Sequence, residues 1–161
     1  MTGTRWMGVD LGEARVGMAL SDPELTVANP AGNIAVYGDY FQALDEVIEL
    51  AEDESAARII VGLPLLLNGQ EGRSAKKARR WAKALRHRME SLAMDGELAL
   101  PLVPQVELRD ERLTTVSAHR QLTAAGVGGR HHRPMVDQQS AVLLLQAALD
   151  EAAATMRSDI G

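Results

Sequence analysis

Residues 7–22 read MGVDLGEARVGMALSD, and this stretch decides the fold. One apolar run ends on Asp10, a second extends from Val16 to Leu20, and the segment between them, residues 11–15, contains a glycine and two charged residues. Two apolar runs joined by a short segment of this kind are typical of a β-hairpin. We therefore predict a hairpin with the Asp10 carboxylate beside its turn.

The residues after the hairpin alternate between strand and helix patterns. A third strand is predicted within residues 26–36, where Asn29-Pro30 interrupts it. Apolar residues then recur at helical spacing on an acidic segment, which predicts an amphipathic helix from Asp39 to about Glu54. Residues 58–63 form a continuous apolar run that ends at Pro64, as expected of a strand buried on both faces.

The second half begins with a loop at residues 68–72 that opens a long helix. The apolar stripe of this helix consists of Ala75, Ala78, Ala82, Leu85, Met89 and Leu92. Trp81, at the edge of the stripe, is interpreted as core packing. Another strand is predicted around residues 103–108, followed by a helix to about Ala125.

The last part combines a basic glycine-rich loop at residues 126–134 with a final helix from Asp137 to about Met156. The full order of elements is three strands, helix, strand, helix, strand and then helices. This order predicts an α/β fold with a mixed five-stranded sheet, antiparallel in one half and parallel in the other, flanked by helices. A chain of 161 residues, 46% of them hydrophobic, is expected to form one domain over residues 1–161.

The composition excludes several classes of site. The chain contains no cysteine, so it can hold neither a disulfide nor a thiolate-bound metal, and any metal must be bound by oxygen or imidazole. No segment is long and apolar enough to span a bilayer, and the first residues lack the apolar core of a signal peptide. We therefore predict a cytoplasmic protein with no membrane partner.

The charges are unevenly distributed. The formal net charge of −5 argues against a nucleic-acid partner, yet eight of the 17 basic residues lie between Arg73 and Arg88 with no acid among them, while acids crowd between Asp45 and Glu54. A solvated helix face is the commoner explanation of such a basic segment. The alternative is contact with phosphates, for which Lys76 and Arg80 are candidates.

Four segments together resemble the signature blocks of the YqgF/RuvX family of Holliday-junction-resolvase-like proteins. They are residues 7–22, IIVGLPLLLNGQEG (59–72), ELRDERLTT (107–115) and VDQQSAVLLLQAALD (136–150), in the family's order. The resemblance implies a ribonuclease H-like fold. It also implies a nuclease that matures the 5′ end of pre-16S rRNA, with resolution of Holliday junctions in DNA as an alternative role.

Hydrolysis of a phosphodiester requires an activated water and relief of charge on the phosphoryl and leaving oxygens, which two metal ions about 4 Å apart supply. Hard ions such as Mg²⁺ or Mn²⁺ prefer oxygen ligands. Asp10 ends one predicted strand, Asp110 or Glu111 ends another, and Asp137 starts the last helix, so three distant segments each deliver an acid to the end of an element. The resemblance implies that Asp10, Glu111 and Asp137 are the catalytic residues and metal ligands.

Each acid also has a structural explanation. Asp10 can be a turn residue, Asp137 an N-cap, and Glu111 a surface partner of Arg112 or Arg15. Strand alternation places Asp110, but not Glu111, on the face of Val106 and Leu108, so only one of the two can join the core-facing set. An unbroken strand favours Asp110 as a secondary candidate; a turn at Asp110 favours Glu111, as does the resemblance.

Four arginines adjoin the acids in the sequence, namely Arg15, Arg112, Arg130 and Arg133. A guanidinium group matches phosphate oxygens bidentately, so these side chains are candidates for contacts with a nucleic-acid backbone. They could equally be solvated or paired with the acids. Neither RNA precursors nor branched DNA is favoured by such contacts, and both a monomer and a homodimer are compatible with the sequence.

Two other functions are compatible with parts of the sequence. Residues 9–22 also resemble the phosphate loop of the actin and sugar-kinase ATPases, but those enzymes need two such domains and this chain has room for one. A protein that binds nucleic acid during ribosome assembly without cutting it would share the fold and the partner. Divalent metal bound at the three acids would distinguish the nuclease from that assembly factor.

Overall fold

The computed structural model describes residues 4–12, 14–37, 39–113 and 133–160, and of residues 133–137, 159 and 160 it describes the backbone alone. Five strands form one sheet in the order β3-β2-β1-β4-β5. Their bounds are β1 Arg5–Leu11, β2 Arg15–Ser21, β3 Ala28–Ala35, β4 Ala56–Leu63 and β5 Gln105–Asp110. The first three strands are antiparallel neighbours, whereas β4 and β5 run parallel to β1. The predicted mixed sheet is therefore confirmed.

The predicted hairpin is formed by β1 and β2. Asp10 pairs with Gly17 and Leu11 with Val16, and the Gly12 amide donates to the carbonyl of Arg15 across the turn, at 2.8 Å. β3 lies at the edge of the sheet, where Pro30 is tolerated because one side of an edge strand needs no hydrogen-bond donor. The pairing of β2 with β3 shifts register between Met18 and Ala19, next to Pro30.

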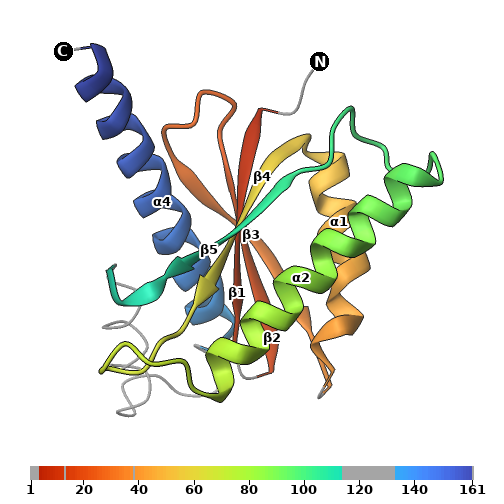
Figure 1. Cartoon of the computed structure of the whole chain (residues 1–161), viewed down its shortest axis with the longest axis horizontal. Coiled ribbons are helices and arrows are strands. Elements are labelled where there is room, and N and C mark those ends of the chain that lie inside the picture. The colour runs from red at the N-terminus through yellow and green to blue at the C-terminus, as the bar shows by residue number, and fades with distance from the viewer. Residues whose placement is uncertain (1–3, 13, 38, 114–132, 161) are drawn as a thin grey trace.

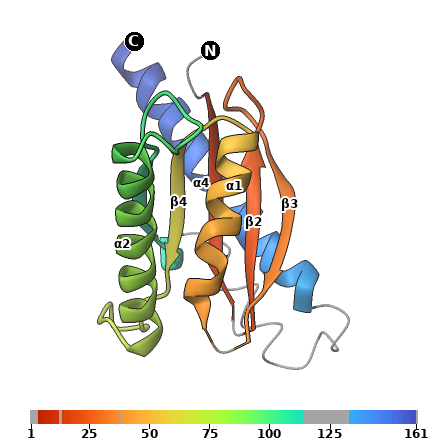
Figure 2. The same ribbon diagram turned by 90° about the vertical axis from the view of Figure 1, so that its right-hand side faces the viewer.

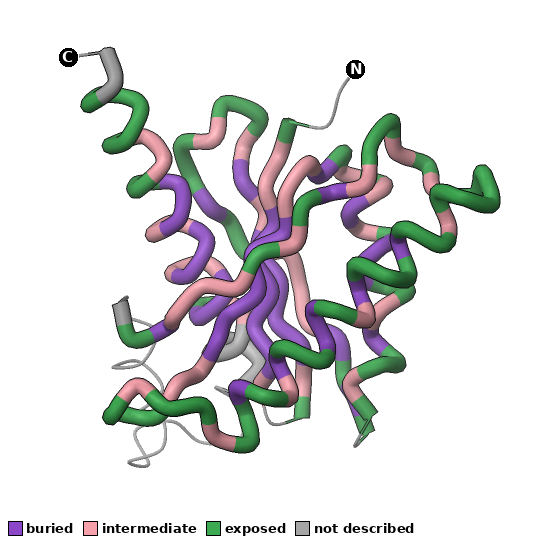
Figure 3. Tube along the Cα trace, viewed as in Figure 1, coloured by how far each residue is buried: buried purple, intermediate pink, exposed green. Residues whose placement is uncertain are grey.

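Helices cover both faces of the sheet (Figures 1 and 2). The 3-10 helix η1 (Tyr40–Ala43), α1 (Leu44–Asp53) and α2 (Arg73–Met94) lie on one face, and α4 (Arg133–Ile160) lies on the other. The central strands between these layers are the most deeply buried part of the molecule (Figure 3). The helix predicted from Asp39 is thus two elements, and the Asp39 carboxylate caps η1 by accepting from the amide of Phe41 at 3.0 Å.

The apolar stripe predicted for α2 is confirmed. All its members are buried except Leu92, which packs against the same core while half-exposed. Trp81 is also buried, and its indole Nε1 donates to the carbonyl of Tyr40 at 2.9 Å, so it is a core residue, as predicted.

The last helix begins earlier than predicted. α4 starts at Arg133, four residues before Asp137, because Pro134 lies in the first turn, where a proline needs no amide donor. The alternative explanation of Asp137 as an N-cap is therefore wrong. The predicted helix to Ala125 lies outside the described residues, and the described end of the predicted 126–134 loop, residues 133 and 134, belongs to α4.

α4 packs closely on the middle of β1 because residue 8 is a glycine. A Cβ at Gly8 would lie 2.8 Å from the carbonyl oxygen of Ala141 and 3.0 Å from the Cβ of Leu145. Within the described residues, no helix has the length and hydrophobicity needed to cross a bilayer.

Candidate active site

Asp10 lies on the central strand of the sheet, on the face that α4 covers. Strand alternation sends Met7, Val9 and Leu11 into the core beneath α1 and α2. Gly8 meets α4, and Asp10, two residues further, shares that face. The side chain of Asp10 is 1% exposed although it stands near the end of the strand. A buried carboxylate at this position is not an ordinary turn residue.

Glu111 reaches the same face from the other side of β4. The strand β5 ends at Asp110, and the chain turns there into the 3-10 helix η2 (Glu111–Leu113). The Glu111 carboxylate lies directly over Gly62 of β4, where a Cβ would come within 2.2 Å of its Oε1, and Glu111 is 3% exposed. Val61 pairs with Val9, so Gly62 is the neighbour of Asp10 in the sheet. The two buried acids therefore lie on one face, on either side of a glycine.

Asp110 occupies the opposite face of the sheet and is paired with Arg112. It shares the alternation of Val106 and Leu108, which pack on the core beneath α2. Its carboxylate accepts from the backbone amide of Arg112 at 2.9 Å and from the Arg112 Nη2 at 2.9 Å. The side-chain hydrogen bond from Arg112 lowers the pKa of Asp110. The arginine is thus paired with Asp110, and Glu111 is a buried residue, not a surface partner.

Asp137 belongs to the part of α4 whose backbone alone is described. It lies one helical turn before Ala141, the residue that packs over Gly8. Figure 1 shows that α4 begins at the end of the sheet where β1 and β4 end. The backbone of Asp137 therefore lies toward the end of the sheet that carries Asp10 and Glu111.

Among the side chains that the structure describes, no three His, Cys, Asp or Glu residues gather closely enough to hold a metal ion. The side chain of Asp137 is not among them. Asp10 and Glu111 supply two carboxylates, which are hard oxygen donors of the kind that Mg²⁺ and Mn²⁺ prefer. These two carboxylates thus fit a divalent ion whose ligand set is completed by a third acid.

The predicted phosphate contacts are distributed over several parts of the molecule. Arg15 begins β2 beside the hairpin turn and shares the face of Gly17, the partner of Asp10. Arg112 lies on η2. Arg133 begins α4 with its side chain not described, and Arg130 lies outside the described residues.

Lys76 and Arg80 are exposed on α2, and the sheet separates them from Asp10. The structure therefore brings Arg15 and Arg112 to the end of the sheet that carries the acids, whereas the helix of Lys76 and Arg80 covers the opposite face of the sheet.

Two supporting residues were missed by the sequence reasoning. Gly62 stands inside an apolar strand, where a glycine signals a close approach by another group, and this signal could have found it. The Tyr40 hydroxyl donates to the carbonyl of Gly12 and so anchors the hairpin turn beside Asp10. No local pattern in the sequence connects Tyr40 to that turn.

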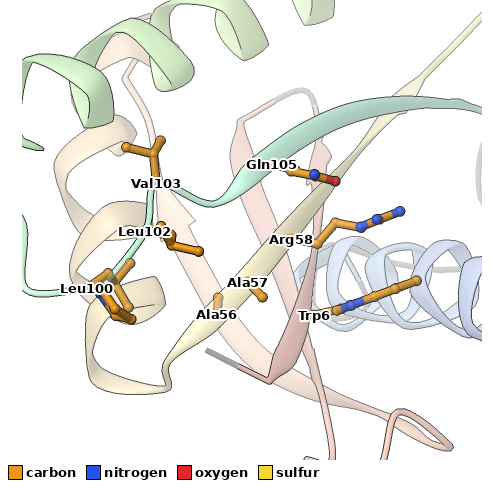
Figure 4. A pocket seen from close by; sticks show the side chains of 9 residues that line it. Trp6, Ala56, Ala57, Arg58, Leu100, Leu102, Val103 and Gln105 are labelled. Carbon is orange, nitrogen blue, oxygen red and sulfur yellow. The ribbon is translucent and has the colours of Figure 1, made fainter. Parts of the chain in front are cut away.

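The described pocket lies elsewhere. It has a volume of about 290 Å³ and is lined by Trp6, Arg58, Leu100, Leu102, Val103 and Gln105, among others (Figure 4). The side chain of Arg58 stacks on the Trp6 ring, 4.6 Å from its centroid. These residues stand at the beginnings of the parallel strands, whereas Asp10 and Glu111 stand at their ends. The pocket is therefore not part of the carboxylate site.

Comparison with known proteins decides the family. A family model for RuvX, described as Holliday junction resolvase, matches residues 4–151. The chain belongs to the RuvX family. A RuvX relative from Bifidobacterium adolescentis is 63% identical over 145 residues, covering 90% of this chain and 96% of the relative. A relative from Nocardia farcinica is 36% identical over 159 residues, covering 96% and 82%. Both are provisionally named pre-16S rRNA nucleases.

Solved structures confirm the fold expected of a RuvX chain. T. thermophilus RuvC in complex with a Holliday junction substrate superposes with a TM-score of 0.52 at 13% identity, covering 94% of this chain and 97% of RuvC. The fold is ribonuclease H-like, as the resemblance implied. At this level of identity the similarity concerns the fold alone.

Proposed function

We propose that this chain is a metal-dependent nuclease that cuts the 5′ leader of pre-16S rRNA. The observation that carries the proposal is the meeting of two buried carboxylates, Asp10 and Glu111, on one face of the sheet on either side of Gly62. Buried charged groups in proteins are paired or coordinate metal ions, and two carboxylates on one face are suited to hold a divalent ion. The provisional names of the relatives favour the rRNA leader as the substrate.

Asp10, Glu111 and Asp137 would hold two Mg²⁺ or Mn²⁺ ions. Bound divalent ions supply an activated water and relieve charge on the phosphoryl and leaving oxygens. Gly62 leaves the space in which the Glu111 carboxylate stands, and the Tyr40 hydroxyl fixes the turn after Asp10. These contacts hold the two acids in place before substrate arrives, which reduces the cost of ordering them during binding.

Arg112 and Arg15 are the proposed contacts to substrate phosphates near the cut. The carboxylate of Asp110 orients the guanidinium of Arg112, and the half-exposed guanidinium retains donors for a phosphate oxygen. Arg130 and Arg133 remain candidates for the same role. A precursor of ribosomal RNA as substrate would place the protein in the cytoplasm.

A second candidate function is the resolution of Holliday junctions in DNA. The description of the family model favours it. Resolution by two symmetric cuts requires a dimer with two sites, whereas trimming of an rRNA leader requires one. The proportion of dimer in solution and the preferred substrate together distinguish the two functions.

The proposal is tested by incubating the purified chain with a pre-16S leader RNA and with a four-way DNA junction, in Mg²⁺ or in Mn²⁺. We expect metal-dependent cutting of the RNA, reduced about 100-fold or more in Asp10→Asn and in Glu111→Gln. The matched control is Glu107→Gln, the same chemical change on an exposed residue of β5, and it should retain activity. Asp110→Asn should mainly raise KM, because it releases Arg112.

Two results would overturn the proposal. Binding of RNA without cutting, unchanged by Asp10→Asn, would favour the assembly factor. Cutting that is abolished by Asp110→Asn and retained in Glu111→Gln would exchange the roles of these two acids. Circular dichroism of each variant separates a loss of activity from a loss of fold.

A further inference from the structure

The cations of α2 divide into two sets according to their partners. Three are paired with acids: Arg79 with Glu71 at 2.5 Å, Arg86 with Glu90 at 3.7 Å and Arg88 with Asp45 at 3.1 Å. A fourth, Lys77, lies over the ring of Tyr40 with its Nζ 3.8 Å from the centroid. These side chains stand on the two flanks of the helix, between its buried and its solvent-facing sides.

The second set has no ion-pair partner among the described residues. It consists of Arg73, Lys76, Arg80 and Lys83, which we call the outer row. At 3.6 residues per turn the four lie within an arc of about 80°, and they extend over about 15 Å of the helix axis. The arc is centred opposite the buried stripe, so the row faces solvent along its whole length.

The outer row starts close to the end of the sheet that carries the acids. α2 packs on β4 and β5, and β5 is an edge strand. The loop from β4 to α2 carries Gly69, whose Cβ position is 3.4 Å from the Nη1 of Arg112. Arg73 follows four residues later and α2 then runs away from η2 (Figure 1). A strand of nucleic acid that passes Arg112 and crosses the edge of β5 would therefore reach the row.

We propose that the outer row binds the sugar-phosphate backbone of a double-helical arm next to the bond that is cut. This inference rests on the proposed nuclease function. Arginines and lysines in a row that have no ion-pair partner among the described residues are suited to bind successive phosphates. The row contains no Phe, Tyr or Trp on which unpaired bases could stack, so a duplex is favoured over a single strand.

A second copy of this chain is not the expected partner of the row. Two-fold packing of α2 on itself would bring the same four cations together, and like charges at an interface oppose association. The acids of α1 do not neutralise the row either, since the ion pair described between the two helices is made by Arg88 on the flank. Phosphates of a nucleic acid are the remaining complement.

The test measures binding in the absence of divalent metal, so that it does not depend on cleavage. Fluorescence anisotropy compares Lys76→Gln/Arg80→Gln with Arg86→Gln/Arg88→Gln, which removes the same charge from paired positions of the same helix. The probes are two leader hairpins, one with an arm that ends at the cut and one with an arm longer by a duplex turn. For the longer hairpin, the outer-row variant should make the negative slope of log K against log salt shallower by about 2, because each of the two lost phosphate contacts removes about 0.9 from its magnitude.

The paired-position variant should keep the slope of the unmodified chain, and the shorter hairpin should show no difference between the variants. Equal slopes for both variants on the longer hairpin would overturn the outer row as a binding surface, whatever the nuclease assay shows. A chain that binds through the row but cuts neither RNA nor DNA would instead overturn the proposed nuclease function alone. Dimers that dissociate only in the outer-row variant would assign the row to self-association.

Discussion

The Oε1 of Glu111 lies 2.2 Å from the position that a Cβ of residue 62 would take, so the carboxylate stands where a side chain of β4 would otherwise be. Real Cβ atoms essentially never come within 3.0 Å of another heavy atom, so a methyl group at residue 62 would force the Glu111 carboxylate to move. Asp10 is on the neighbouring strand at the same level. The glycine is thus a structural requirement of the site and takes no part in the chemistry itself.

Gly62→Ala should abolish cleavage while the fold is retained. The added methyl group displaces the Glu111 carboxylate from its place beside Asp10, and overpacking of this kind costs about 1–3 kcal/mol of stability. Cleavage assays and thermal unfolding, run on the same preparation, check both parts. The control is Ala57→Gly, on the same strand but at the end far from the acids. An active Gly62→Ala protein would show that cleavage does not require the Glu111 carboxylate at its present position.

Asp10→Asn should raise the stability of the protein while it removes activity. In the absence of metal, Asp10 and Glu111 bring two formal negative charges to one buried face of the sheet, and active sites commonly sacrifice stability for function in this way. We expect the free energy of unfolding to increase by about 0.5–2 kcal/mol in EDTA. Urea denaturation provides the measurement. A less stable Asp10→Asn protein would mean that the carboxylate is held by favourable contacts that outweigh the repulsion.

Gly8→Ala should weaken the packing of α4 on the sheet. The new Cβ would lie 2.8 Å from the carbonyl oxygen of Ala141, a backbone atom that cannot move without the helix. We expect a loss of about 1–3 kcal/mol in stability. Since Asp137 is one turn before Ala141, cleavage should also decrease. Hydrogen exchange of the α4 amides locates the change, and unaltered protection there would contradict the expected displacement.

Asp22 should make the stability of the protein sensitive to acid. The Thr26 hydroxyl and the amides of Thr26 and Val27 donate to its carboxylate and lower its pKa to about 2 from the ordinary 3.8. A carboxyl whose pKa is lower in the folded state stabilises the protein above the unfolded pKa and loses that contribution as the pH falls through the folded pKa. The advantage of the unmodified chain over Asp22→Asn should therefore be present at pH 5 and decline between about pH 4 and pH 2.

The control for this titration is Asp53→Asn, at an exposed residue near the end of α1. Its stability relative to the unmodified chain should not follow the curve of Asp22→Asn. Chemical denaturation at several pH values supplies both curves, and parallel curves would contradict the assignment to Asp22.

Much of the fold could be predicted because it is encoded by local patterns. The hairpin around Asp10, the buried strand 58–63 and the stripe of α2 each depend on the periodicity of a short segment. The start of α4 could not be placed in this way, since Asp137 offers a suitable cap and Pro134 equally suits the first turn. Both positions satisfy the local rules, so the pattern around them cannot choose between the two starts.

The candidate site was only partly predictable for a related reason. The choice between Asp110 and Glu111 depends on the residue at which β5 ends, and the strand pattern up to Leu108 is compatible with either end. Tertiary contacts decide it: Arg112 binds Asp110, and Gly62 leaves room for Glu111. Gly62 lies far from Glu111 along the chain, so this complementarity is invisible in the sequence around either residue.

The parallel placement of β5 beside β4 also has a consequence for synthesis on the ribosome. The pairings of β1 with β2 and of β2 with β3 join segments that are close in the sequence, so this meander can form early, with Asp10 already in place. Glu111 is added after β5, and the face that carries both acids stays open until α4 has been made and has docked on Gly8. We therefore expect a nascent chain that ends before residue 111 to be inert toward RNA, so that a protein made next to ribosomal RNA acquires its cutting ability only after most of it has been translated.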